Sequence, residues 1–250
     1  MIHIYIISDL HLEERKSIPD DIFPTDPIQP NSICILNGDI SEPDLDSYTQ
    51  FLQEAKSKFD HVIVCIGNHE CYYSSLWYAD TKCRQICEEL GCIFLEKESV
   101  VIDGVKFIGT TLWSNITPEV YAMLNKKCLK GYHSIEEFSD ENFDYSSVLF
   151  EENLNYIQAE LAISDLPCVV ITHHAPTRLM NNSQRGRCMK MEAVYCNDLD
   201  DMFSAPIVLW VSGHTHVARI LEINNVLLVS NPYGRKKEKT GYDRNLYISL

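Results

Sequence analysis

The sequence contains short apolar runs that each end in a cluster of polar side chains. Such runs occupy 2–7, 32–36, 61–66, 168–171 and 207–211. Apolar runs of four to six residues bounded by turn residues are typical of buried strands. Because the first three runs are separated by loops and helix-like segments, we expect a largely parallel sheet with helices on its outside.

Between these runs the sequence predicts two amphipathic helices, over about 45–59 and 75–90. Tyr48, Phe51 and Ala55 recur at helical spacing in the first, and Gly91 provides a stop signal for the second.

Beyond residue 92 the pattern favours short strands, with Asp103-Gly104 as a two-residue hairpin turn between two of them. The remaining predicted elements are strands at 92–95, 99–102 and 105–110, a short helix near 191–203, a hairpin formed by 217–223 and 226–230, and a last strand at 245–250.

The segment 114–165 interrupts the strand pattern. It contains ten Asp and Glu residues but three Lys residues, with helix-like parts near 118–129 and 146–163. It has too few apolar residues to close a core of its own. We therefore expect a helical insertion or cap within a single domain that spans residues 1–250.

Composition limits the classes of partner and compartment. A net charge of −15 argues against binding to long nucleic acid, which relies on clustered Lys and Arg, whereas a small phosphorylated substrate remains compatible because bound metal ions would invert the local charge. No apolar run approaches the roughly 20 residues needed to cross a bilayer. The ten cysteines include no CxxC pair and no secretion signal precedes them, so we expect reduced thiols and a cytoplasmic protein.

The polar clusters at the strand ends are rich in metal-binding side chains. They comprise Asp9, His11, Asp39, Asn68, His69, His173, His174, His214 and His216. Each of these residues alone has an ordinary explanation as a turn residue or a surface histidine. Ligand sites in such sheets lie beyond the carboxyl ends of the strands, so five clusters at strand ends indicate one shared site. Oxygen and nitrogen donors without thiolate suit Mn, Fe, Zn, Mg or Ni and argue against a structural zinc.

In their order along the chain these residues resemble the five motifs of the calcineurin-like metallophosphoesterase superfamily. The matching segments are Asp9-Leu10-His11, Gly38-Asp39, Gly67-Asn68-His69-Glu70, His173 and Gly213-His214-Thr215-His216. The resemblance implies an α/β fold, a four-layer α/β/β/α sandwich of two mixed sheets flanked by helices. It also implies hydrolysis of a phosphomonoester or phosphodiester at a dinuclear metal centre, with Mn favoured and a hydroxide that bridges the two ions as the nucleophile.

The resemblance also implies a role for each matching residue. His69 would be the catalytic residue, which donates a proton to the leaving oxygen or stabilises the transition state. The implied metal ligands are Asp9, His11 and His216 for the first ion, Asn68, His173 and His214 for the second, and Asp39 bridging both.

Several alternatives stay open at this stage. His174 competes with His173 as the metal ligand, although the position directly after the strand favours His173. Glu42 is either a partner that orients His69 or an ordinary acid at a helix start, and Glu70 is expected only to solvate or support its loop. Three arginines on the loop after the fourth motif either grip a phosphate or form a solvated face: Arg178, Arg185 and Arg187.

Two other functions compete with the hydrolase on the same fold. One is a non-catalytic metal-binding interaction module, and the other is a nuclease that acts on short nucleic acid. The sequence determines neither the substrate nor the oligomeric state.

Overall fold

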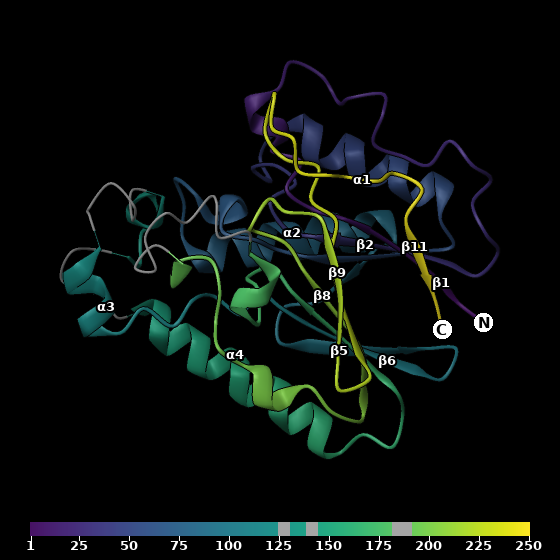
Figure 1. Cartoon of the computed structure of the whole chain (residues 1–250). Helices are drawn as coiled ribbons and strands as arrows, with labels where there is room; N and C mark the ends of the chain where they lie inside the picture. The colour runs from purple at the N-terminus through teal and green to yellow at the C-terminus, as the bar shows by residue number, and fades with distance from the viewer. Residues whose placement is uncertain (125–130, 139–144, 182–191) are drawn as a thin grey trace.

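The computed structural model describes residues 1–124, 131–138, 145–181 and 192–250, which form two mixed β-sheets that stack face to face (Figure 1). The first sheet has the order β11 (Tyr247–Ser249), β1 (His3–Ile7), β2 (Ser32–Asn37), β3 (His61–Cys65), β4 (Ile93–Phe94). The second has the order β5 (Glu98–Ile102), β6 (Val105–Thr110), β7 (Cys168–Thr172), β8 (Ile207–Ser212), β10 (Val226–Ser230), β9 (Arg219–Ile223). Strands β1 to β4 are parallel, as are β6, β7, β8 and β10, whereas β11, β5 and β9 are antiparallel edge strands.

Alternation along the strands separates an inner core from two outer cores. On β1, Ile4 and Ile6 face the second sheet, while Tyr5 and Ile7 face the helices. Helices α1 (Asp46–Lys58) and α2 (Leu76–Leu90) cover the outer face of the first sheet. The predicted two-sheet α/β fold is therefore confirmed.

Local sequence signals explain where α2 begins and ends. The Ser75 hydroxyl accepts a hydrogen bond from the Tyr78 amide at 3.1 Å, which satisfies one of the first amides of the helix. At the other end Gly91 has a φ of 68°, the left-handed conformation that terminates many helices.

The segment predicted as an insertion contributes to the body of the fold. Its helix α4 (Tyr145–Ala162) lies along the outer face of the second sheet (Figure 1). There Phe150 and Ile157 are buried against Ile108 and Val170. Burial of each such side chain is worth about 1.5–3 kcal/mol. The shorter α3 (Pro118–Met123) precedes it, and the rest of the predicted helix at 125–129 lies outside the described residues.

The helix predicted near 191–203 is wrong for the residues that the structure describes. A turn is followed by an irregular stretch and a short 3-10 helix, Asp200–Met202. The Asn197 amide group donates to the Trp113 carbonyl at 2.9 Å, and the Asn197 backbone amide donates to the Ala175 carbonyl at 2.9 Å. Because these bonds to neighbouring loops replace helical bonds, tertiary contacts override the helical pattern of the segment.

The parallel strands of both sheets end at the same side of the sandwich. The loops that follow β1, β2, β3, β7 and β8 therefore converge, and every predicted site residue lies on one of these loops. Among the described residues no helix is long and apolar enough to cross a membrane.

Candidate metal centre

Five of the seven predicted metal ligands have a left-handed backbone. The φ values are 55° at Asp9, 48° at His11, 54° at Asp39, 63° at His214 and 53° at His216. For residues other than glycine this conformation is uncommon and costs about 1–3 kcal/mol. The surrounding loops maintain it, since the Asp9 amide donates to the Gly38 carbonyl and the His11 amide to the Asp39 carbonyl, both at 3.0 Å. Such clustering of strain is expected where side chains are positioned for function.

The first group of ligand atoms comes from Asp9, His11, Asp39 and His216, all buried. One ligand atom from each lies within 4.8 Å of the others. The Nε2 atoms of His11 and His216 are 3.0 Å apart, and Asp9 Oδ1 lies 3.3 Å from His216 Nε2. Two imidazole nitrogens and a carboxylate oxygen thus face a common point, an arrangement that suits a cation.

The second group consists of Asp39, His173 and His214, again with ligand atoms within 4.8 Å of one another. His173 Nε2 lies 3.3 Å from Asp39 Oδ1, and Asp39 Oδ2 lies 3.9 Å from His11 Nε2. One carboxylate oxygen of Asp39 therefore faces each group.

Two buried atoms at the second group have no hydrogen-bond partner. Asn68 donates its amide to the Tyr72 hydroxyl at 2.6 Å, which leaves its Oδ1 unpaired, and His173 Nε2 is also unpaired. Most buried polar atoms in proteins are satisfied, so such atoms call for an explanation, which a bound ion can supply. These two are ligand atoms of the kind that a divalent ion takes, and the residues present fit a metal.

The electrostatics of the cluster favour bound positive charge. Burial raises the pKa of Asp9, but the hydrogen bond and charge of His216 outweigh it and lower the pKa to about 2. Burial lowers the pKa of His216, but Asp9 and Glu238 raise it to about 10. For His173, burial is outweighed by Asp39, which raises the pKa to about 9. The carboxylates thus stay ionised and draw protons onto the imidazoles, protons that metal binding would displace.

His174 lies outside both groups. Its Nδ1 is 3.3 Å from the Thr111 carbonyl oxygen, and its Nε2 is 3.2 Å from the Tyr132 hydroxyl. Burial, together with the charges of His214 and His173, holds its pKa well below the usual range. The structure thus brings His173, and not His174, to the oxygen of Asp39.

His69 is held by Glu13, and the alternative pairing with Glu42 is not observed. His69 Nδ1 lies 2.9 Å from Glu13 Oε1, and His69 Nε2 lies 2.9 Å from Arg235 Nη2. Because a guanidinium only donates hydrogen bonds, Nε2 accepts here and Nδ1 donates to Glu13. Glu13 Oε1 also lies 3.1 Å from His11 Nδ1, so one carboxylate positions both His69 and a predicted metal ligand.

Two carboxylates near His69 raise its pKa. Burial lowers its pKa, but the charges of Asp39 and Glu13 outweigh that effect and raise it. Glu13 itself has a pKa lowered to about 2, since its bonds to His11 and His69 outweigh its burial.

Glu70 supports the loops, which was its expected role. Its buried carboxylate accepts from the backbone amides of Asp39 at 2.9 Å, Ile40 at 2.8 Å and Gly67 at 2.8 Å. These bonds tie the loop after β2 to the loop after β3. Burial, reinforced by the charge of Asp39, raises the pKa of Glu70 to about 7.

Gly67 allows these two loops to approach closely. A Cβ atom there would collide with Asp39 Oδ1 and lie 2.7 Å from both the Asp39 amide nitrogen and His173 Cε1. We expect Gly67→Ala to destabilise the protein by about 1–3 kcal/mol and to lower metal affinity roughly 10-fold. Thermal unfolding and calorimetric metal titration measure the two effects.

Gly104→Ala is the control for this substitution. A Cβ at Gly104 meets nothing within 4 Å, and its φ of 80° imposes backbone strain alone. It should lose some stability and keep wild-type metal affinity. Equal metal affinity in both variants would contradict the assigned role of Gly67.

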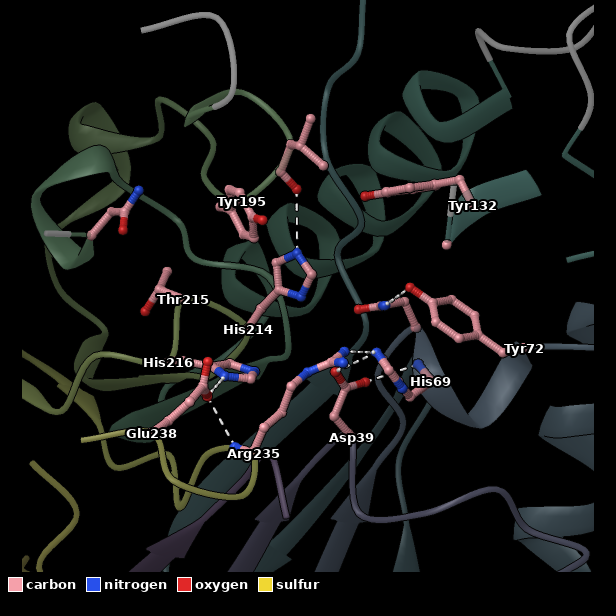
Figure 2. A pocket seen from close by; sticks show the side chains of 14 residues that line it. Asp39, His69, Tyr72, Tyr132, Tyr195, His214, Thr215, His216, Arg235 and Glu238 are labelled. Carbon is pink, nitrogen blue, oxygen red and sulfur yellow. Dashed lines mark hydrogen bonds and ion pairs between the residues drawn. The ribbon is translucent and has the colours of Figure 1, made fainter. Parts of the chain in front are cut away.

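A pocket of about 260 Å³ opens over the two groups (Figure 2). Besides the predicted residues, its lining includes three tyrosines, and Arg235 and Glu238 from the loop after β10. Glu238 Oε2 lies 2.5 Å from His216 Nδ1 and accepts from the Arg235 amide at 2.9 Å. The tyrosines are Tyr72, Tyr132 and Tyr195.

Sequence reasoning assigned no role to Glu13, Arg235 or Glu238. The only available signal was the position of the segment 231–234, just beyond the last predicted hairpin and directly before Arg235. Arg178 is not in the pocket lining and pairs instead with Asp198 at 2.6 Å. Arg185 and Arg187 lie outside the described residues.

Comparison with known proteins identifies the family. Residues 2–218 match the family model described as calcineurin-like phosphoesterase. The chain is 29% identical over 269 residues to the uncharacterized protein L509 of Acanthamoeba polyphaga mimivirus, covering 98% of this chain and 95% of the relative. It is 30% identical over 165 residues to the uncharacterized metallophosphoesterase YkoQ of Bacillus subtilis, covering 58% of each.

Solved structures share the fold. Phosphopantetheinyl hydrolase (PptH) of Mycobacterium tuberculosis superposes with a TM-score of 0.69 at 19% identity, covering 95% of this chain and 93% of that one. A putative 5′-nucleotidase of Staphylococcus aureus gives 0.51 at 15% identity, covering 92% of this chain and 48% of that one. At these identities the likeness concerns the fold alone.

Proposed function

The chain belongs to the calcineurin-like phosphoesterase family, and we propose that it is a metal-dependent phosphoesterase with a dinuclear centre. The observation that carries the proposal is Asp39, whose two carboxylate oxygens face two separate groups of buried ligand atoms. A carboxylate in that position can hold two cations side by side.

We assign the proposed ligands to two metal ions, one ion for each group of ligand atoms. Asp9, His11 and His216 would hold the first ion, Asn68, His173 and His214 would hold the second, and Asp39 would be shared. Two divalent ions, when bound, polarise the phosphoryl group and lower the pKa of water. Donors without thiolate suit Mn²⁺, which we favour, and also Fe, Zn, Mg or Ni.

The chain's own groups would act on the leaving side of the substrate. Glu13 fixes the ring of His69 through Nδ1, so that Nε2 points into the pocket. There Nε2 accepts a hydrogen bond from the Arg235 guanidinium. A phosphate that enters between them would accept hydrogen bonds from the guanidinium and from protonated His69. From this position His69 would donate its Nε2 proton to the leaving oxygen.

The size of the pocket and the net charge of the chain suit a small phosphorylated substrate. A volume of about 260 Å³ accommodates a phosphoryl group with a small substituent. The net charge of −15 disfavours long nucleic acid. A monoester and a diester both remain candidates.

A substrate panel tests the proposal. Metal-stripped protein would be reloaded with Mn²⁺, Zn²⁺, Fe²⁺, Mg²⁺ or Ni²⁺ and assayed on 4-nitrophenyl phosphate and bis(4-nitrophenyl) phosphate. We expect hydrolysis that depends on the metal and is lost in ligand variants. If no metal supports hydrolysis of either ester, and ligand variants behave as wild type does, the interaction-module alternative is favoured.

A pair of variants tests which neighbouring histidine binds metal. We expect His173→Ala to lower the bound metal from two ions to about one per chain, because its Nε2 faces Asp39. His174→Ala should retain two ions, because its nitrogens face Thr111 and Tyr132. Metal content measured by mass spectrometry after desalting decides between them, and the reverse pattern would overturn the assignment.

A further inference from the structure

A basic loop borders the metal centre of this acidic protein. The chain carries a net charge of −15, yet residues 235–239 read Arg-Lys-Lys-Glu-Lys. This loop follows β10 and lies at the rim of the pocket, where Figure 2 shows Arg235 and Glu238 beneath the histidines. Clustered positive charge beside a phosphoesterase site is suited to a second anionic group.

A second cleft, of about 320 Å³, is also bordered by this loop. Arg235 and Glu238 line both the cleft and the metal-centre pocket, so the two spaces are adjacent. Four basic residues line the cleft, against two acidic ones: Arg15, Arg235, Lys237 and Lys239, with Asp21 and Glu238.

Both acidic groups in the cleft are already engaged. Glu238 lies 2.5 Å from His216 Nδ1 and accepts from the Arg235 amide, and Asp21 accepts from the Tyr233 hydroxyl at 2.6 Å. The bond between Glu238 and His216 also fixes the basic loop against a proposed metal ligand. The distance between the two spaces is therefore set by the fold.

The basic side chains that line the cleft differ in how many contacts they make with the rest of the protein. Arg15 is held in place, since its guanidinium donates to the Leu10 and Gly234 carbonyls and lies over the Tyr233 ring. Lys237 and Lys239 are exposed and form no ion pair with any residue that the structure describes. They are the groups in the cleft that are available to a ligand.

We infer that this cleft is a subsite for a second phosphate of the substrate. The inference rests on the proposed function, which places the scissile phosphate at the metal centre. Lys237 and Lys239 would bind a phosphate several bonds away from the scissile one. The substrate class is then a small molecule with two separated phosphate groups.

A series of non-hydrolysable ligands tests this inference. Alkane-α,ω-bisphosphonates with one to five methylene groups would be compared with alkylphosphonates of the same length, at a buffered free Mn²⁺ concentration. Isothermal titration calorimetry gives the affinities, and inhibition of 4-nitrophenyl phosphate hydrolysis gives a second readout. At the best spacing we expect the bisphosphonate to bind about 3- to 10-fold more tightly than its matched monophosphonate.

Variants of the loop assign the effect to named residues. Lys237→Ala with Lys239→Ala should bring the affinity ratio close to one, while Lys236→Ala, which removes one positive charge from a neighbour outside the cleft, should keep it. A wild-type ratio near one at every spacing, or a ratio unchanged in the double variant, overturns the subsite. If the protein hydrolyses no ester, the proposed function fails, and the calorimetric ratio still decides whether the subsite exists.

Discussion

Replacing His69 by Ala is expected to lower kcat by about 10²- to 10⁴-fold, the usual contribution of a positioned proton donor. Both metal ions should stay bound, because His69 belongs to neither group of proposed ligands. Its imidazole lies 4.0 Å from Asp39 Oδ2 and is held by Glu13, so it borders the place where we propose that the phosphate binds. Steady-state kinetics and metal analysis of the variant measure the two quantities.

The nature of the leaving group separates proton donation from a structural role. A 4-nitrophenolate is a weak base and gains little from protonation, whereas an alkoxide gains much. The defect of His69→Ala should therefore be larger on an alkyl phosphate than on 4-nitrophenyl phosphate. An equal defect on both esters would indicate that His69 stabilises charge on the phosphoryl group instead.

His61→Ala is the matched control for this substitution. His61 is exposed at the start of β3, away from the carboxyl ends of the strands. Its kinetics should equal those of wild type with either ester. Loss of bound metal in His69→Ala, with kinetics that metal addition restores, would contradict the catalytic role.

Glu13→Gln should reproduce part of the defect of His69→Ala. It keeps the shape of the side chain but removes the charge that raises the pKa of His69. The variant also tests whether Glu13 supports metal binding through His11, in which case metal affinity falls about 10- to 100-fold.

The fold was predictable because its signals are local. The apolar runs and the Ser75 to Gly91 helix follow from periodicity and capping, and these depend on residues close together in the sequence. The strand ends then brought the motif residues together, since parallel strands end on one side of a sheet.

The residues that hold the site residues in place were not predictable, because no local pattern in the sequence connects them to the site. Arg235 is 166 residues from His69 and lies in an irregular loop, so neither spacing nor periodicity connects them. Glu13 is two residues from His11, but its direction depends on the 3-10 turn Leu12–Glu14. The helix predicted near 191–203 was wrong because Asn197 forms hydrogen bonds to distant loops and not within a helix.

Asp39→Asn is expected to have the largest effect of any single substitution. The change removes one charge and one of the two oxygens that face the separate groups, so one ion loses a ligand and the other keeps only a neutral amide oxygen from this residue. Metal ions contribute several kcal/mol of charge stabilisation to such reactions, and kcat should fall about 10³-fold or more. The result should persist at saturating substrate, because the loss concerns the reacting centre and not substrate affinity.

Thermal unfolding with and without metal shows whether this loss is specific. Metal at 100 times its Kd should stabilise wild-type protein by about 2.7 kcal/mol, and in Asp39→Asn most of that gain should disappear. Asp60→Asn is the control, since Asp60 also accepts backbone and hydroxyl hydrogen bonds, from Ser32, but lies at the opposite end of the strands. It should keep the full response to metal. If Asp39→Asn retains two ions and wild-type kcat, Asp39 is not shared between the ions, and the dinuclear centre must be built from other residues.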